Sequence, residues 1–487
     1  MNVRRQPTRR FVLTLVASTL LVAPWTGCAE PDVDLRAEVA PASDAHLAVP
    51  AFGAGPVLPS VGLLEGQTLL SWGALSPDPT VFANPVAMWF VRWLQWWDRE
   101  GRPTSTVQDA GPHEGYAETW ARWEGELVGQ YWGAPLGGTG FVRESQRVHR
   151  ARARVGEPVR FERIRMPIAE PGCSACSLLA IPIGAGWASL PAAPVGGRVW
   201  LTMAYPPSIG GCRDRLNDMR LSAVGDGDLA MPWSWLDPLC EYPRSFPAGR
   251  SEGDILNYWA FSTPADTLGA LFLSSRSDGR GGSDLAYFYM YADPSAGGQP
   301  FREPREPVLV APDRPSMEDG HQPRATALGS RILAATPSHD SSSRCYTLRT
   351  FEVDGSDNRE TPWQLPCRRD ASVSVHYVEL ATISHGALLV YSVRPNPSVT
   401  ALDDAVIEAV VLTPEGRRGS EIVRVTPPQA RARPIRGVGP LAEGRPALAT
   451  EGDRAVVAWT DAREDAPGLY YRHLEVRTLP AASEMEP

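Results

Sequence analysis

The chain has 487 residues, 43% of them hydrophobic, which is enough to bury one large core or several small ones. Its 44 glycines and 47 prolines follow no short period, which indicates many turns and favours an all-β protein. The net charge of −9 argues against a nucleic-acid-binding surface, and the absence of lysine excludes Schiff-base lysines and Gly-Lys-Ser/Thr phosphate loops.

Residues 1–27 have the pattern of an export signal rather than of a folded segment. Four arginines, at positions 4, 5, 9 and 10, precede an apolar run at residues 11–23 that is too short to span a membrane stably. The segment ends Trp25-Thr26-Gly27-Cys28. It resembles a bacterial lipoprotein signal peptide, although Trp25 stands where that family usually has Leu. The resemblance implies that Cys28 carries the lipid and that, with Ala29 rather than Asp next, the protein is exported to the outer membrane.

The remaining domain boundaries follow from composition. Residues 28–58 are rich in Ala, Pro and Asp and predict a flexible tether, part of which, at residues 47–58, is compatible with an added strand. Residues 59–480 are expected to form the folded domain, and residues 481–487 a disordered tail. No other segment has about 18 continuous apolar residues, so the lipid is the expected contact with the membrane.

A glycine followed by an apolar run recurs along this domain and predicts a repeat. The seven marks lie 57 to 72 residues apart, at Gly66, Gly125, Gly197, Gly269, Gly329, Gly386 and Gly452. The clearest copy is Gly452-Asp-Arg-Ala-Val-Val-Ala-Trp459-Thr-Asp461-Ala-Arg463, which reads as the start of a β-hairpin. Each repeat reads strand, Gly turn, strand, loop, strand, turn, strand, and seven of them predict a seven-bladed β-propeller of four-stranded blades.

One segment of the first repeat has two interpretations. Asn84-Pro85 and Gly101 would suit the start and the stop of a helix, with Trp89, Trp93 and Trp97 on one face. Its place in the repeat favours a strand instead.

The blade pattern also resembles known propellers. Val456-Val-Ala-Trp459-Thr-Asp461 followed by Leu469-Tyr-Tyr471 is similar to blades of large secreted bacterial β-propeller proteins, and Ser274-Ser-Arg276…Ser283-Asp284 to blades of TolB-type propellers. The resemblance implies a fold and not an activity, because propellers include both binding proteins and enzymes.

Once Cys28 is assigned to the lipid, six cysteines remain, an even number that predicts disulfides in an oxidising compartment. They are Cys173, Cys176, Cys212, Cys240, Cys345 and Cys367. Cys173-Ser-Ala-Cys176 lacks the βαβ context of a redox motif, so a structural disulfide is expected there. We expect sequential pairing, Cys212 with Cys240 and Cys345 with Cys367, between loops on one face.

Thirteen of the sixteen tryptophans lie between Trp72 and Trp259, and most are expected to pack between blades. The exceptions are candidates for an aromatic ligand face: Trp233, Trp235 and Trp259.

No cofactor or metal site is expected, and no catalytic residue is identified. The aspartates near residues 278–284 and 461–465 lack calcium-loop spacing and are interpreted as solvated turns, with Asp461 and Arg463 forming a structural ion pair. No Gly-x-Ser-x-Gly motif occurs. The glutamates at positions 114, 118, 124 and 126 lie near two tryptophans and would suit a carboxylate pair, but we interpret them as a solvated edge.

Three functions fit these features. The first is an envelope lipoprotein whose propeller binds a protein or a glycan without catalysis. The second is a propeller glycoside hydrolase of sialidase-like type, which would use an arginine cluster and a Tyr–Glu nucleophile, although that family's Ser-x-Asp-x-Gly-x-x-Trp boxes are absent. The third is a structural component of an envelope assembly.

Overall fold

The computed structural model divides the chain into two units, residues 1–34 and residues 35–487. All described residues belong to the second unit: 37–52, 55–75, 90–113, 117–132, 148–163, 189–190, 192–205, 218–224, 233–234, 257–277, 283–292, 308–311, 322–340, 343–395, 405–430, 445–463 and 465–478. Within these ranges the secondary structure is β-strands and one short 3-10 helix, η2 (Pro366–Arg368). No helix in this part of the chain is long and apolar enough to cross a membrane.

The strands form seven antiparallel sheets, which we number as blades 1–7 in chain order from β3. Blades 1 to 3 contain β3 (Val57–Leu64), β4 (Gln67–Leu75), β5 (Phe90–Trp97) and β6 (Gln108–His113); β8 (Trp120–Trp123), β9 (Glu126–Trp132), β10 (Val148–Ala153) and β11 (Arg160–Arg163); β13 (Ala192–Val195), β14 (Arg198–Tyr205), β15 (Asp218–Val224) and β16 (Trp233–Ser234). Two further strands, β7 (Ala117–Glu118) and β12 (Ser189–Leu190), pair in parallel between blades.

Blades 4 to 7 have the same plan. They contain β17 (Asn257–Ser262), β18 (Leu268–Ser277), β19 (Ser283–Ala292) and β20 (Val308–Ala311); β21 (Arg324–Leu328), β22 (Arg331–Asp340), β23 (Ser343–Phe351) and β24 (Arg359–Glu360); β25 (Val373–Ile383), β26 (Gly386–Pro395), β27 (Val406–Leu412) and β28 (Val423–Arg424); β29 (Ala447–Glu451), β30 (Arg454–Asp461) and β31 (Gly468–Thr478). Blade 7 takes its outer strands, β1 (Ala37–Pro41) and β2 (His46–Pro50), from the beginning of the described chain.

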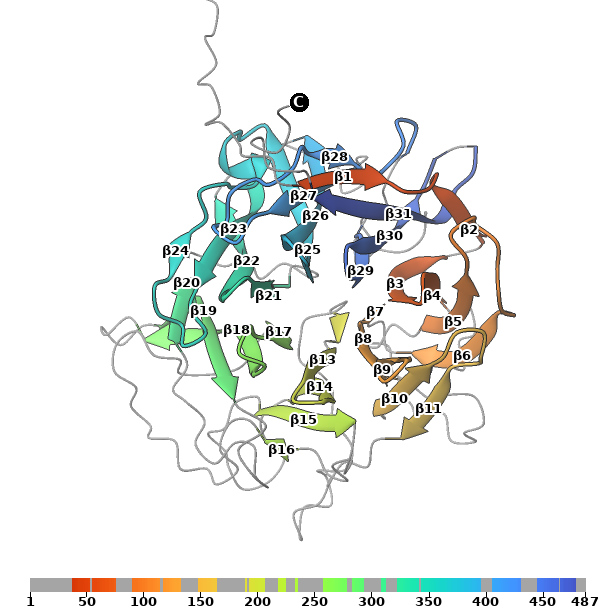
Figure 1. Ribbon diagram of the computed structural model, residues 1–487, viewed down its shortest axis with the longest axis horizontal. Coiled ribbons are helices and arrows are strands. Elements are labelled where there is room, and N and C mark those ends of the chain that lie inside the picture. Colours follow the sequence, from red (N-terminus) through yellow and green to blue (C-terminus); the bar gives the residue numbers. More distant parts are fainter. Residues whose placement is uncertain are drawn as a thin grey trace, which may run out of the picture. The chain divides into compact units, whose positions relative to one another are not determined.

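The blades are arranged in a ring, as Figure 1 shows. The innermost strand of each blade contacts that of the next, in the order β3, β8, β13, β17, β21, β25, β29 and back to β3. Hydrophobic clusters lie between neighbouring blades rather than within one, for example Trp200 of blade 3 with Phe288 of blade 4. The predicted seven-bladed β-propeller is confirmed.

The inner hairpins explain why glycine marks the repeat. Between β3 and β4, Glu65 and Gly66 both have positive φ, 53° and 74°, as the two central residues of a type I′ turn require. Only glycine adopts such a conformation without steric cost. Two of the seven marks are displaced, however. Gly386 is the first residue of β26, and Gly269 lies inside β18, where it makes room for the ring of Phe261.

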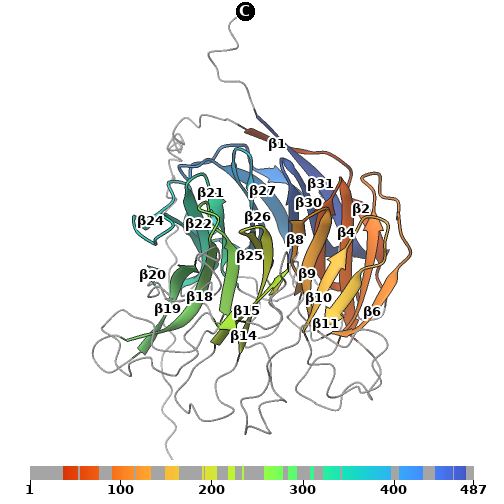
Figure 2. The same ribbon diagram turned by 60° about the horizontal axis from the view of Figure 1, so that its bottom comes forward.

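Two faces of the ring can be distinguished by their connections. The face with the short inner hairpins is called the turn face, and the opposite face, where β4 ends and β5 begins, the loop face. Carboxylates join neighbouring hairpins on the turn face. Asp453 accepts a hydrogen bond from the backbone N–H of Ser384 (3.0 Å), and Glu451 accepts from Glu65 and Gly66 (3.0 and 2.9 Å). Figure 2 shows the neighbouring blades that these contacts connect.

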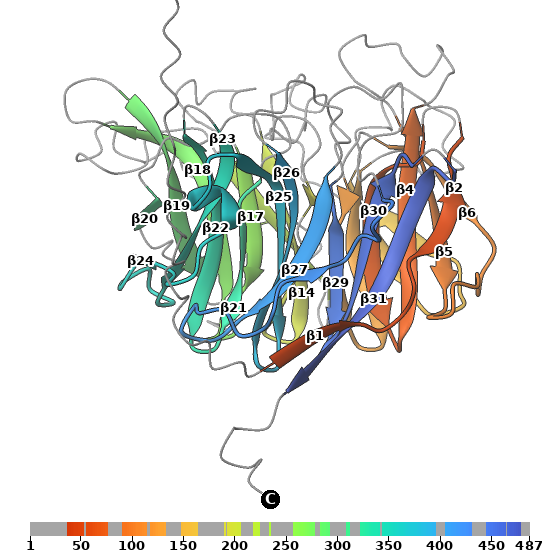
Figure 3. The ribbon, with the colours of Figure 1, turned by 90° about the horizontal axis from the view of Figure 1, so that it is seen from above.

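The N-terminal strands close the ring. β1 pairs with β31 from Ala37 opposite Thr478 to Pro41 opposite Leu474, and β2 pairs with the other end of β31. Figure 3 shows β1 crossing the end of β31. Residues 37–46 were expected to belong to a flexible tether, and an added strand was thought compatible only with residues 47–58. In fact β1 and β2 both complete blade 7, because β31 would otherwise expose unpaired backbone groups along its outer edge.

Other sequence expectations are settled by individual elements. The first-repeat segment is a strand over its described part, β5, rather than a helix. Cys345 and Cys367 form a disulfide, but they do not both lie in loops: Cys345 is within β23 and Cys367 is in η2. Cys28, Cys173, Cys176, Cys212 and Cys240 lie outside the described residues, as do the signal peptide and the C-terminal tail.

Removal of β1 and β2 should destabilise the ring. We expect a chain that begins at residue 51 to melt about 5 °C or more below the full chain, because the buried Ala37, Val39 and Ala48 and the pairing of β31 are lost. Differential scanning calorimetry measures this, and a chain that begins at Leu35 is the matched control, which should melt with the full chain. Equal melting temperatures for the two truncated chains would contradict the claim that β1 and β2 stabilise the ring.

Candidate functional site

The inner strands of blades 5, 6 and 7 bring together a charged cluster that no local motif announced. Arg324 is the first residue of β21, Glu379 lies in β25, and Arg445 lies two residues before the start of β29. Arg324 binds the Glu379 carboxylate through two hydrogen bonds, Nε to Oε2 and Nη2 to Oε1, both of 2.8 Å. Arg445 Nη2 donates to the same Oε1 at 3.4 Å. We call these three residues the inner cluster.

Aromatic side chains surround the inner cluster. The guanidinium of Arg324 lies 4.1 Å from the ring centroid of Trp259, whose Nε1 donates to the carbonyl of Ala325 (3.1 Å). Tyr346 and Tyr377 are buried nearby: Tyr346 interacts electrostatically with both arginines and Glu379, and Tyr377 with Arg445. The cluster and its surroundings therefore combine a cation–π contact, a forked ion pair and phenol groups from four blades.

Burial and neighbouring charges shift the pKa values of two groups in the cluster. Burial and the nearby charge of Arg324 both lower the pKa of Arg445, because each disfavours a second guanidinium cation at this place. Burial also raises the pKa of Tyr346, so its phenol stays neutral and remains a hydrogen-bond donor.

The fold does not require charges at this level of the ring. Arg324 and Glu379 each occupy the fifth cross-strand pair counted from the inner hairpin, opposite Ala335 and Val390. In blade 1 that position is Ser60, and in blade 7 it is Ala447. Because blades 1 and 7 form the same strand pairing with small uncharged residues at this position, the charges of Arg324 and Glu379 are not needed for the fold of a blade.

A serine–histidine pair lies farther along β25, but its polarity excludes nucleophilic activation. Arg344 Nη1 lies 3.2 Å from His376 Nδ1, and a guanidinium can only donate, so Nδ1 is the acceptor and the ring proton is on Nε2. Nε2 then donates to Ser374 Oγ, at 3.0 Å. A general base would have to accept the serine proton at this nitrogen.

The residues predicted from sequence contribute unevenly to this site. Trp259 is part of it, packed under Arg324, whereas the side chain of Trp233 and the whole of Trp235 lie outside the described residues. Arg324, Glu379 and Arg445 were missed, because they are 55 and 66 residues apart in sequence. Within the described ranges, no group of histidines, cysteines, aspartates and glutamates is arranged to hold a metal ion.

The expected ion pair of Asp461 and Arg463 is present, but it is not a solvated turn. Asp461 is fully buried, and its Oδ2 accepts from Arg463 Nη2 at 2.5 Å. The guanidinium also stacks on Tyr470. The pair stabilises the end of β30 and takes no part in the inner cluster.

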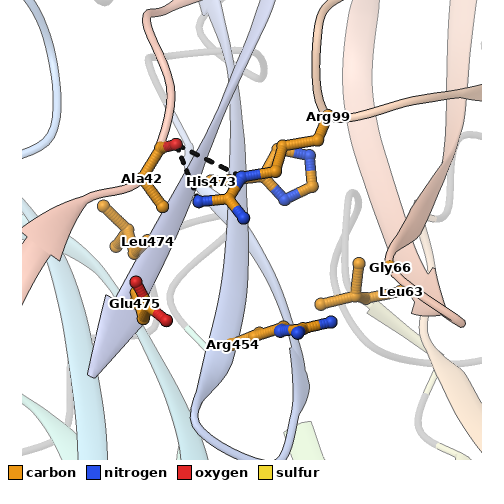
Figure 4. Close-up of a pocket in the computed structure, with 8 residues that line it drawn as sticks. All are labelled: Ala42, Leu63, Gly66, Arg99, Arg454, His473, Leu474 and Glu475. Carbon is orange, nitrogen blue, oxygen red and sulfur yellow. Dashed lines mark hydrogen bonds between the residues drawn. The ribbon is translucent and has the colours of Figure 1, made fainter. Parts of the chain in front are cut away.

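A small notch lies at the seam between blades 7 and 1 (Figure 4). It is lined by Ala42, Leu63, Gly66, Arg99, Arg454, His473, Leu474 and Glu475. Arg99 donates from Nε and Nη2 to the carbonyl of Ala42, at 3.2 and 3.0 Å, and so holds the connection between β1 and β2. His473 lies behind this contact, with Nε2 3.1 Å from Thr68 Oγ1. The notch serves the closure of the ring.

No protein-family model and no curated protein matches the sequence. Solved structures are similar in fold. A Trypanosoma rangeli sialidase in complex with the inhibitor DANA matches at 10% identity with a TM-score of 0.34, over 92% of this chain and 59% of its own length. The chain thus spans less than two thirds of that sialidase. Polysaccharide lyase Uly1 matches at 11% identity with a TM-score of 0.47, over 88% of this chain and 92% of its own. The PL25 ulvan lyase matches at 12% identity with a TM-score of 0.45, over 92% and 99%.

His473 should make the stability of the ring depend on pH. Burial, together with the charges of Arg99 and His46, lowers the pKa of His473 to about 4, whereas an unfolded histidine has a pKa near 6.5. Between these values the unfolded chain binds the proton more tightly. The contribution of neutral, buried His473 to the free energy of unfolding is therefore fully present above pH 6.5 and is lost as the pH falls toward 4.

When the pH is lowered from 7 to 4.5, we expect the free energy of unfolding of the unmodified protein to fall by about 2.5 kcal/mol more than that of His473→Gln. Denaturant titrations of both proteins at the two pH values measure it. His385→Gln is the control, since His385 is an exposed histidine beside Asp453 on the turn face. An unchanged pH dependence in His473→Gln would contradict this assignment.

Proposed function

We propose that the protein is a binding module that recognises an acidic glycan through the loop face of its propeller, at the inner cluster. The observation that carries this is the convergence of Arg324 and Arg445 on one carboxylate at a level of the ring where blades 1 and 7 have Ser60 and Ala447. Arginine forks match carboxylate and sulfate groups, and neighbouring aromatic side chains suit the apolar faces of sugars.

The state of Glu379 favours binding over hydrolysis. Two-carboxylate glycoside hydrolysis needs one carboxylic acid that gives up a proton and a second carboxylate on the other side of the bond. In the inner cluster, as far as the structure describes it, Glu379 is the one carboxylate, and both of its oxygens accept hydrogen bonds from Arg324. The role that suits it is to fix the orientation of the arginines.

One observation favours a second candidate, a glycoside-degrading enzyme. Tyr377 lies two residues from Glu379 on β25 and within the charge field of Arg445. A phenol beside a carboxylate is the nucleophile pair of sialidase-type enzymes. Turnover of a bound glycan that Tyr377→Phe abolishes would establish this alternative, whereas binding without turnover supports the module.

We expect the full chain to bind carboxylated or sulfated glycans on a glycan array and their neutral counterparts at least about tenfold more weakly. Arg445→Gln should weaken the binding of acidic ligands by a similar factor, because it removes a charged hydrogen bond. The affinity of the unmodified protein should fall as the salt concentration rises, because salt screens the same interaction. Arg359→Gln, an exposed arginine of β24, is the matched control. The absence of acidic ligands, or equal losses in both variants, would overturn the proposal, with circular dichroism confirming that each variant is folded.

We also propose that the protein is located at the outer membrane and carries a lipid on Cys28. The pattern of an export signal in residues 1–27 supports this location. β1 begins at the turn-face end of blade 7, because Ala37 pairs with Thr478 at the end of β31.

Replacement of Cys28 by Ser should release the protein. We expect Cys28→Ser to move from the membrane to the soluble fraction on fractionation of an expressing bacterium, because lipidation supplies the hydrophobic attachment. Arg359→Gln, which changes an exposed arginine of β24 and leaves residue 28 intact, is the control. Retention of Cys28→Ser in membranes would show that the anchor is not this lipid.

A further inference from the structure

A second concentration of arginines lies on blade 2, away from the inner cluster. Glu126, the first residue of β9, is only 1% exposed, although the sequence analysis placed it on a solvated edge. Three arginines converge on its carboxylate: Arg152 from β10, Arg154 just beyond β10, and Arg160, the first residue of β11. We call these three residues the arginine triad. It lies at the turn-face end of the two outer strands, in a chain whose net charge is −9.

Short contacts fix the triad in place. Arg152 Nε donates to Oε2 at 2.6 Å, Arg154 Nε donates to Oε1 at 2.5 Å, and Arg160 Nη2 donates to Oε1 at 2.9 Å. Burial alone would raise the pKa of Glu126, but the hydrogen bonds and charges of Arg152 and Arg154 outweigh it and hold the pKa below its usual range. Glu126 therefore remains a carboxylate that orients three cations.

The triad directs further donors outward. Arg152 and Arg154 use Nε to bind Glu126, so their terminal Nη groups remain available, and no other partner for them occurs among the described residues. Arg154 and Arg160 are half-exposed, at 52% and 51%. Arg152 lies 5.4 Å from the ring centroid of Trp123, which limits its movement.

The number of arginines exceeds what the carboxylate needs. Glu379 of the inner cluster, for comparison, binds two arginines, Arg324 and Arg445. Glu126 binds three, which leaves a net charge of +2 on the four side chains. Arg150 of the same blade forms a separate ion pair with Glu162 (3.3 Å).

We propose that the arginine triad binds a doubly charged oxyanion, namely inorganic phosphate or a phosphate monoester. A dianion neutralises the charge of +2, and its oxygens match the terminal N–H groups of guanidinium forks that are already oriented by Glu126. Preorganisation reduces the entropy that binding would otherwise cost, because the three side chains do not have to be assembled by the ligand.

Calorimetric titration of the full chain at low ionic strength tests this, with inorganic phosphate and glucose 6-phosphate as the probes. We expect both to bind, and both Arg154→Gln and Arg160→Gln to weaken binding at least about tenfold. The two arginines are half-exposed, so the melting temperatures of the variants should stay close to that of the unmodified protein. Arg102→Gln is the matched control, because Arg102 is an exposed arginine with acidic partners in blade 1.

Vesicles distinguish the source of the phosphate. Sedimentation with phosphatidic-acid vesicles but not with phosphatidylcholine vesicles, lost in Arg160→Gln, assigns the site to a lipid headgroup, whereas binding of glucose 6-phosphate alone assigns it to a soluble monoester. Arg445→Gln should leave phosphate binding unchanged, so this test does not depend on whether the inner cluster binds a glycan. Absence of binding to every probe, or equal weakening by Arg102→Gln, overturns the proposal.

Discussion

The ring depends on one constraint, which is that its last sheet must be completed by the beginning of the chain. β31 lies toward the outer edge of blade 7, and its backbone groups are paired by β1 and β2, from 418 (468 − 50) to 441 (478 − 37) residues earlier in sequence. The same blade contacts blade 1 through β29 and β3, so the strands that complete blade 7 lie beside the seam that closes the ring. Closure matters for every blade, because among the described strands each blade packs mainly against its two neighbours.

The polar groups of this seam show how closure is secured. Tyr471 donates to the carbonyl of Asp98, Arg99 donates to that of Ala42, and His473 stays neutral in the interior. The contact of Tyr471 joins the two ends of the chain, whereas that of Arg99 holds the connection between β1 and β2. The notch at the seam is thus a consequence of the architecture, whereas the inner cluster and the arginine triad are features of single sectors.

These two sectors use arginine differently. In the inner cluster the guanidinium of Arg324 is enclosed by Trp259 and Glu379, which suits recognition of a ligand that enters the loop face. In the triad a buried carboxylate orients arginines toward solvent. In a chain without lysine, both arrangements exploit the planar fork of guanidinium, which holds a fixed orientation better than an ammonium group does.

The sequence by itself determined what depends on neighbours along the chain. Gly66 and Gly452 mark inner hairpins because tight turns need positive φ, and Asp461 pairs with Arg463 because residues two apart lie on the same side of a strand. Only the tertiary structure decided which residues meet across blades. Arg324, Glu379 and Arg445 come from three repeats, and Glu126 is buried because β10 and β11 fold over it. Such contacts depend on the register and curvature of whole sheets, which no local spacing encodes.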